Sequence, residues 1–101
     1  MDPKTGLELT KLLLQVVYAD DVVTDVERQT LLAAAARLGG DGAVALVHDV
    51  LDGGQPLPPP NMGALAAHRH LVMQEVGRIA ASDGIHRDEV DLIKTIGELL
   101  R

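Results

Sequence analysis

Residues 7–19 read LELTKLLLQVVYA, residues 20–24 read DDVVT, and residues 25–38 read DVERQTLLAAAARL. The first stretch is apolar around most of a helical circumference, and its polar side chains form one narrow stripe of Glu8, Lys11 and Gln15. A helix of this kind is usually the buried centre of its domain. The acidic stretch that follows is too short and too charged to extend the helix. The sequence therefore predicts a helix, an acidic turn and a second helix.

Local signals predict where these helices begin and end. Thr5 followed by Glu8, and Thr24 followed by Glu27, each fit a capping box, which places helix starts at both sites. Gly39–Gly40 is a helix-stop signal. A short third helix is then expected over residues 43–51.

The rest of the chain is divided by proline. Residues 53–60 read GGQPLPPP, which favours an extended connector, with a ligand for a proline-recognition domain as the less favoured alternative. Asn61 is expected to cap a long helix over residues 62–82. A last helix is expected over residues 88–100. The core stripe of the long helix is predicted to run through Leu65, His68, Val72, Val76 and Ile79.

Length and composition exclude several classes of protein. The 101 residues are enough for one domain, with 47% apolar residues but only one aromatic, Tyr18, so aliphatic helices are favoured. A net charge of −6 disfavours nucleic-acid binding, and the absence of cysteine excludes disulfides and thiolate sites. No signal peptide is visible, and the longest apolar run, residues 31–36, is too short to insert into a membrane. A cytoplasmic protein is expected.

The two halves of the chain resemble each other. A shift of 62 residues aligns Asp21 with Asp83, each in an acidic turn, and Glu27 with Glu89, each in the first turn of the helix that follows. We therefore expect an all-α fold: one compact domain of two pseudo-repeated helical hairpins, with about five to seven helices. Its first half covers residues 5–52, its connector residues 53–60, and its second half residues 61–101.

Eight of the fifteen acidic residues lie in two short windows, one in each half. If the repeat brings the windows together, their carboxylates would need a cation or protons, and carboxylate oxygens suit Ca²⁺ or Mg²⁺. The alternative is that these acids only cap helices, because carboxylates in a first turn are favoured by the helix dipole. The windows contain Asp20, Asp21, Asp25 and Glu27, and Asp83, Asp88, Glu89 and Asp91.

Other chemistry is weakly indicated. His68 and His70 fall on different faces of one helix, His86 is read as a solvated turn residue, and His48 has no evident partner. The sequence contains no nucleophile elbow, phosphate-binding loop, zinc-protease motif or dinucleotide fingerprint, so a non-enzymatic protein is expected.

The acidic windows also carry a family resemblance. Residues 19–27 read ADDVVTDVE, and residues 82–89 read SDGIHRDE. They resemble the tellurite-resistance TerB-like family, whose repeats run Ala-Asp-Gly, an aliphatic residue, a polar cap and a Glu that opens a helix. Asp21 replaces the Gly of the first repeat, and the second repeat is one residue shorter.

The resemblance implies an all-α domain whose acids bind a divalent cation, in bacterial stress responses such as tellurite resistance and alongside membrane-associated protein partners. The implied metal site consists of Asp20, Glu27, Asp83 and Glu89, with Asp21 and Asp88 as additions. A second hypothesis is a metal-free helical protein–protein interaction domain with a partner or self-association surface.

Overall fold

The computed structural model describes residues 2–18, 23–53, 56–81 and 94–98. Four helices lie in the order α1 (Pro3–Val17), α2 (Asp25–Leu51), α3 (Met62–Ala66) and α4 (Arg69–Ala81), and residues 94–98 are also helical. No residue of these ranges lies in a strand. The predicted all-α class is thereby confirmed. The Cα radius of gyration, 12.2 Å, is close to the ~13 Å expected for a compact domain of about 100 residues.

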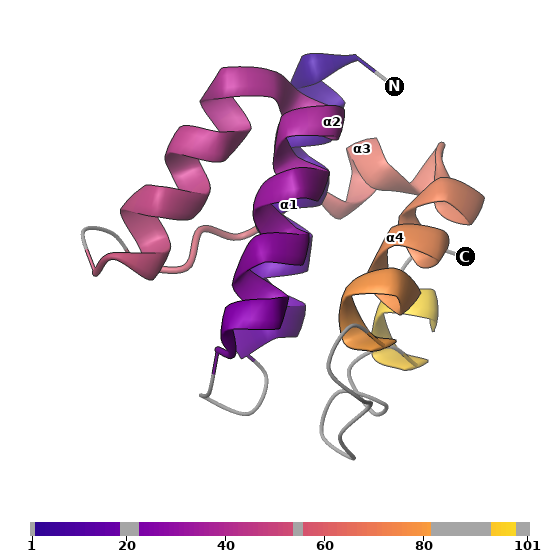
Figure 1. Cartoon of the computed structure of the whole chain (residues 1–101). Helices are drawn as coiled ribbons and strands as arrows, with labels where there is room; N and C mark the ends of the chain where they lie inside the picture. Colours follow the sequence, from indigo (N-terminus) through magenta and orange to yellow (C-terminus); the bar gives the residue numbers. More distant parts are fainter. Residues whose placement is uncertain (1, 19–22, 54–55, 82–93, 99–101) are drawn as a thin grey trace.

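Helix α1 is the centre of the fold, as its apolar circumference predicts. It contacts α2 most extensively and also packs against α3 and α4 (Figure 1). Its polar stripe is half-buried and its other side chains from position 12 to position 17 are buried. The buried apolar residues of α1 are Leu9, Leu12, Leu13, Leu14, Val16 and Val17.

Helix α2 bends at Gly40, where φ is +70°. This left-handed conformation is easily adopted by glycine, so the predicted helix stop at Gly39–Gly40 is confirmed. The bend separates a first arm, residues 25–39, from a second arm, residues 41–51, which runs back along the molecule (Figure 1). The predicted start is also confirmed, because Thr24 and Glu27 form a capping box.

By length and composition, α2 is the one helix among the described ranges that could cross a membrane. The bend at Gly40 leaves neither arm with the ~20 residues that a span requires. Leu31, Ala35 and Leu38 of the first arm are buried in the core that α2 shares with α1. We therefore describe α2 as a packed helix of the domain.

The predicted capping box at Thr5 is wrong. Helix α1 begins at Pro3, and the Asp2 carboxylate accepts the backbone N–H of Thr5 at 2.7 Å. Asp before a proline at the first helical position is a stronger start signal, because proline presets φ and the missing N–H is not needed there. The Glu8 carboxylate instead accepts hydrogen bonds from the Lys11 ammonium at 2.8 Å and from the backbone N–H of Asn61 at 2.9 Å.

The predicted continuous helix over residues 62–82 is interrupted. The chain turns at Ala67 and His68 between α3 and α4, and the predicted cap at Asn61 is confirmed by its bond to the N–H of Ala64 at 3.1 Å. His68 is exposed, which corrects its assignment to the core stripe. In an unbroken helix His68 would lie on the same face as Leu65 and Val72, where an imidazole without a partner is costly.

The proline-rich segment is irregular over residues 56–60, as predicted, and lies along α1. The Gln15 side-chain N–H donates to the Pro58 carbonyl at 3.5 Å, and Glu8 accepts the Asn61 N–H just beyond. The half-buried polar stripe of α1 thus holds this segment in place. Residues 82–93 lie outside the described residues, so the two-hairpin repeat stays a prediction.

Candidate functional site

The structure describes one of the six predicted metal ligands, Glu27. This residue lies in the first turn of α2 and is only 4% exposed. Its Oε1 accepts the backbone N–H of Thr24 at 3.3 Å and the Thr24 hydroxyl at 3.2 Å, while Thr24 accepts the Glu27 N–H at 3.1 Å. At this position the carboxylate is used as a helix cap, which is the alternative that the sequence left open. The other five predicted ligands lie outside the described residues: Asp20, Asp21, Asp83, Asp88 and Glu89.

Within the described ranges, no group of three or more histidine or acidic side chains is placed to hold a metal ion. His68 and His70 are exposed. His48 is also exposed, and its Nδ1 lies 3.7 Å from Asp52, which in turn accepts from Arg28 at 3.0 Å. These are surface contacts, and surface ion pairs contribute little to stability.

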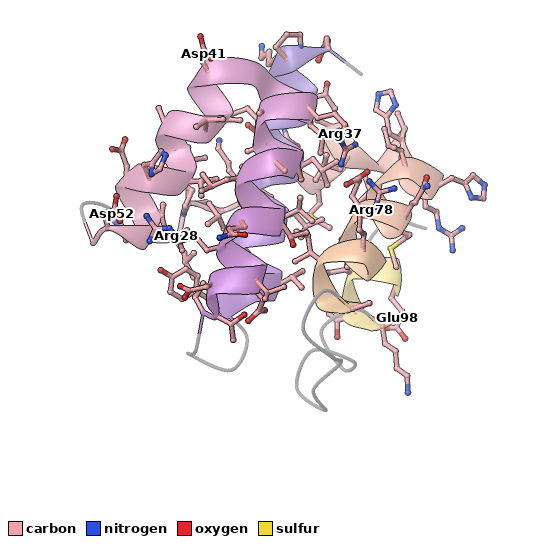
Figure 2. The ribbon with its side chains drawn as sticks, viewed as in Figure 1. Arg28, Arg37, Asp41, Asp52, Arg78 and Glu98 are labelled. Atoms are coloured by element: carbon pink, nitrogen blue, oxygen red, sulfur yellow. The ribbon has the colours of Figure 1, made fainter. Side chains whose placement is uncertain are left out.

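An ion pair with a buried carboxylate, at the junction of α2 and α4, was not predicted from the sequence. The side chain of Glu75 is 2% exposed, and both its oxygens accept from Arg37, at 3.0 and 2.9 Å. Arg78, one turn further along α4, places Nη1 3.5 Å from Glu75 Oε1. Figure 2 shows Arg37 and Arg78 approaching each other from the two helices. A signal was present in the sequence, because Glu75 interrupts the apolar stripe formed by Val72, Val76 and Ile79.

The electrostatics of this pair follow from its geometry. The hydrogen bonds from Arg37 hold the pKa of Glu75 below its usual value, although burial acts in the opposite direction. The same bonds raise the pKa of Arg37. Glu75 is therefore ionised at neutral pH, as a buried carboxylate can be only when it is paired.

A pocket of about 230 Å³ lies where α1, the proline-rich segment, α3 and residues 94–98 meet. Leu12 and Ile96, two of its apolar residues, are almost fully buried, whereas Gln15 and Met62 are half-buried. Ile96 lies within the predicted last helix and is 2% exposed, and residues 94–98 are helical, which confirms that part of the helix. The residues that line the pocket are Leu12, Gln15, Pro59, Pro60, Met62, Thr95 and Ile96.

The pocket depends on the path of the connector. Asn61 is tied to Glu8, and Pro58 to Gln15, so the two prolines between them are held beside α1. The lining has no carboxylate or histidine, and its only polar side chains are those of Gln15 and Thr95. Such a lining suits an apolar group, and it has no acid–base pair or metal ligands.

Comparison with known proteins adds no relative: no protein-family model, curated protein or solved structure matches this chain. The TerB-like resemblance therefore stays a hypothesis that rests on the residues of the two acidic windows.

Proposed function

We propose that the chain is a non-enzymatic helical interaction module that binds a protein partner by receiving an apolar side chain of that partner in the pocket beside α1. The observation that carries this proposal is the pocket itself. It is apolar, it is open to solvent, and it is bordered by a proline-rich segment that is tied to α1 by two hydrogen bonds.

The size and chemistry of the pocket favour an aromatic side chain. Its volume of about 230 Å³ exceeds the ~150 Å³ of an apolar protein cavity that holds benzene. Pro59, Pro60 and Met62 offer flat and polarizable surfaces for a ring, and sulfur–aromatic contacts are favourable. Aromatic residues that enter such pockets are common anchors in protein interfaces.

The chain's own aromatic residue does not supply this anchor. Tyr18 is the only aromatic residue of the sequence, and it caps the C-terminus of α1 and packs against the core. Tyr18 is not among the residues that line the pocket. An aromatic occupant would therefore come from another molecule.

The absence of tryptophan from the chain gives a direct assay. N-acetyl-L-tryptophanamide is excited selectively while unlabelled protein is added, and its emission is recorded. We expect a saturable blue shift, because the indole leaves water for an apolar site. A saturable shift that is absent from the unfolded protein supports the proposal. An emission maximum that does not move up to millimolar protein contradicts it.

Two methionines provide a matched pair of variants. Met62→Ala removes a lining residue, and we expect probe affinity to fall by up to about tenfold. Met73→Ala removes an equally half-buried methionine of α4 that does not line the pocket, and it should leave the affinity unchanged. Equal loss in both variants would mean that the probe responds to general destabilisation.

The twin acidic windows favour a second candidate function. On this proposal the chain is a TerB-like module of the bacterial cytoplasm that binds Ca²⁺ or Mg²⁺ and acts in a stress response such as tellurite resistance, with membrane-associated proteins as partners. Its support is the concentration of eight of the fifteen acidic residues in two windows at corresponding positions. Glu27, buried at the start of α2, would contribute one carboxylate from the first window.

Calorimetric titration with Ca²⁺ and with Mg²⁺ tests this candidate. Saturable heat that Asp20→Asn combined with Asp83→Asn removes would support it. The control combines Asp41→Asn with Asp49→Asn, which changes the net charge equally at two exposed positions of the second arm of α2. Absence of heat together with an unchanged melting temperature in both ions would rule the site out.

A further inference from the structure

Arg37, Glu75 and Arg78 form a cluster with more positive than negative charge. Both guanidinium groups contact the single Glu75 carboxylate, and among the described residues no other acid pairs with either arginine. The carboxylate is buried, whereas the arginine side chains are 48% and 50% exposed. The anion therefore lies beneath the surface, and the two cations extend to the solvent.

Each arginine has more donors than its contact with Glu75 uses. A guanidinium has five N–H groups. Arg37 directs its two terminal nitrogens at Glu75 and Arg78 directs one, and within the part of the chain that the structure describes no other acidic side chain takes up the remaining N–H groups. Because Nη1 of both arginines contacts the same oxygen, Glu75 Oε1, the two groups lie close enough for one small ligand to touch both.

The arginines are also held in position before any ligand arrives. Glu75 is buried on the side of α4 that faces the core, and its two hydrogen bonds restrain the Arg37 side chain. Without them, Arg37 would lose more conformational entropy on binding a ligand. Arg37 and Glu75 lie on different helices and are 38 positions apart in the sequence, so the geometry of the pair is set by the fold. Such preorganisation favours ligand affinity because part of the entropic cost is met in folding.

We propose that Arg37 and Arg78, held apart and oriented by Glu75, form a binding site for a phosphate group. Two guanidinium groups that approach from different helices match the several oxygens and double charge of a phosphate better than a planar carboxylate, which one arginine can satisfy.

This site differs in place and chemistry from the apolar pocket, and it gives the acidic chain a local surface suited to an anion. The long-range field of the −6 charge opposes a dianion, and salt screens that field over about 10 Å. Phosphate binding should therefore persist or strengthen slightly on moving from very low to physiological ionic strength. A contact made only by surface attraction would weaken instead.

The test is an NMR titration that follows the arginine side-chain Nε–Hε signals at constant ionic strength. Inorganic phosphate, N-acetyl-O-phosphoserine amide and acetate are added separately. We expect saturable shifts of Arg37 and Arg78 with both phosphate compounds and a several-fold weaker response to acetate. Tighter binding of the phosphoserine compound identifies a phosphorylated protein as the source, and tighter binding of inorganic phosphate identifies the free ion.

Variants separate the site from general charge. Arg78→Gln should weaken phosphate binding about tenfold while leaving the Arg37–Glu75 pair intact, and Arg78→Lys should weaken it less. Arg69→Gln removes the same charge from an exposed position of α4 and should not change the affinity. Arg37 is left in place, because its removal would deprive the buried carboxylate of its main partner. The proposal is overturned if phosphate gives no saturable shift, if acetate binds equally well, or if Arg78→Gln and Arg69→Gln have the same effect.

Discussion

Helices α1 and α2 approach each other closely at Gly6, which makes a sharp test of the fold. A Cβ added at Gly6 would overlap the carbonyl oxygen of Leu38 and would lie 2.9 Å from the backbone nitrogen of Gly39. Both neighbours are backbone atoms at the bend of α2, so they cannot yield as the end of a flexible side chain can. Gly6→Ala must therefore move one helix relative to the other by on the order of 1 Å.

Two opposing effects set the magnitude. Alanine is a better helix former than glycine by about 1 kcal/mol, which favours the variant. Overpacking of a close contact costs about 1–3 kcal/mol, and here the shift also disturbs the core that α1 shares with α2. We expect the second effect to dominate, with a net loss of about 1–2 kcal/mol in the free energy of unfolding.

Gly77 of α4 is the matched control. A Cβ there would meet nothing within 4 Å in the described part of the chain, so Gly77→Ala should keep only the gain in helix propensity, about 1 kcal/mol. Thermal unfolding followed by circular dichroism should then show a lower melting temperature for Gly6→Ala and a higher one for Gly77→Ala. At ~4–8 °C per kcal/mol for a domain of this size, the two shifts are easily resolved. A folded Gly6→Ala protein that is as stable as the wild type would refute this packing of α1 against α2.

Three further predictions concern caps and charge. Asp2→Ala should lower the melting temperature, because it removes the N-terminal cap of α1. An unchanged melting temperature would instead support a helix start at the predicted capping box of Thr5 and Glu8. Thr24→Ala should cost about 1 kcal/mol in urea unfolding and leave Glu27 without its cap partners; an unchanged midpoint would argue against the capping box. The lowered pKa of Glu75 means that its stabilising effect is complete above the usual glutamate pKa, about 4.3, and is lost as the pH falls through the lower folded value. Glu75→Gln should therefore flatten the fall in stability on acidification below about pH 4.3, and an acid limb as steep as that of the wild type would contradict the pairing with Arg37.

Several features of the fold could be predicted because they depend on residues within one turn of a helix. The capping box at Thr24 and Glu27, the stop at Gly39–Gly40 and the cap at Asn61 were all expected and all observed. These signals work because hydrogen bonds between neighbours decide them. Local signals can also compete, and at the start of α1 the Asp2 cap with Pro3 prevailed over the box at Thr5.

The candidate sites also differ in whether the sequence predicted them. The acidic windows were visible in the sequence, and the one member that the structure describes, Glu27, acts as a cap. The pocket and the arginine pair were not predicted. Glu75 interrupts an apolar stripe, which signals a buried partner, but nothing in the sequence identifies that partner as Arg37, 38 positions away.

By itself the sequence determined the helical class, the largely apolar circumference of α1 and the main breaks in the chain, because helix periodicity and capping act over three or four residues. Only the tertiary structure decided that Gly6 is a crossing point, that Glu8 and Gln15 hold the proline-rich segment, and that Arg37 neutralises Glu75. The physical reason is that each of these contacts joins residues far apart in the chain. Their energy depends on how the helices pack together, and no local pattern encodes that arrangement.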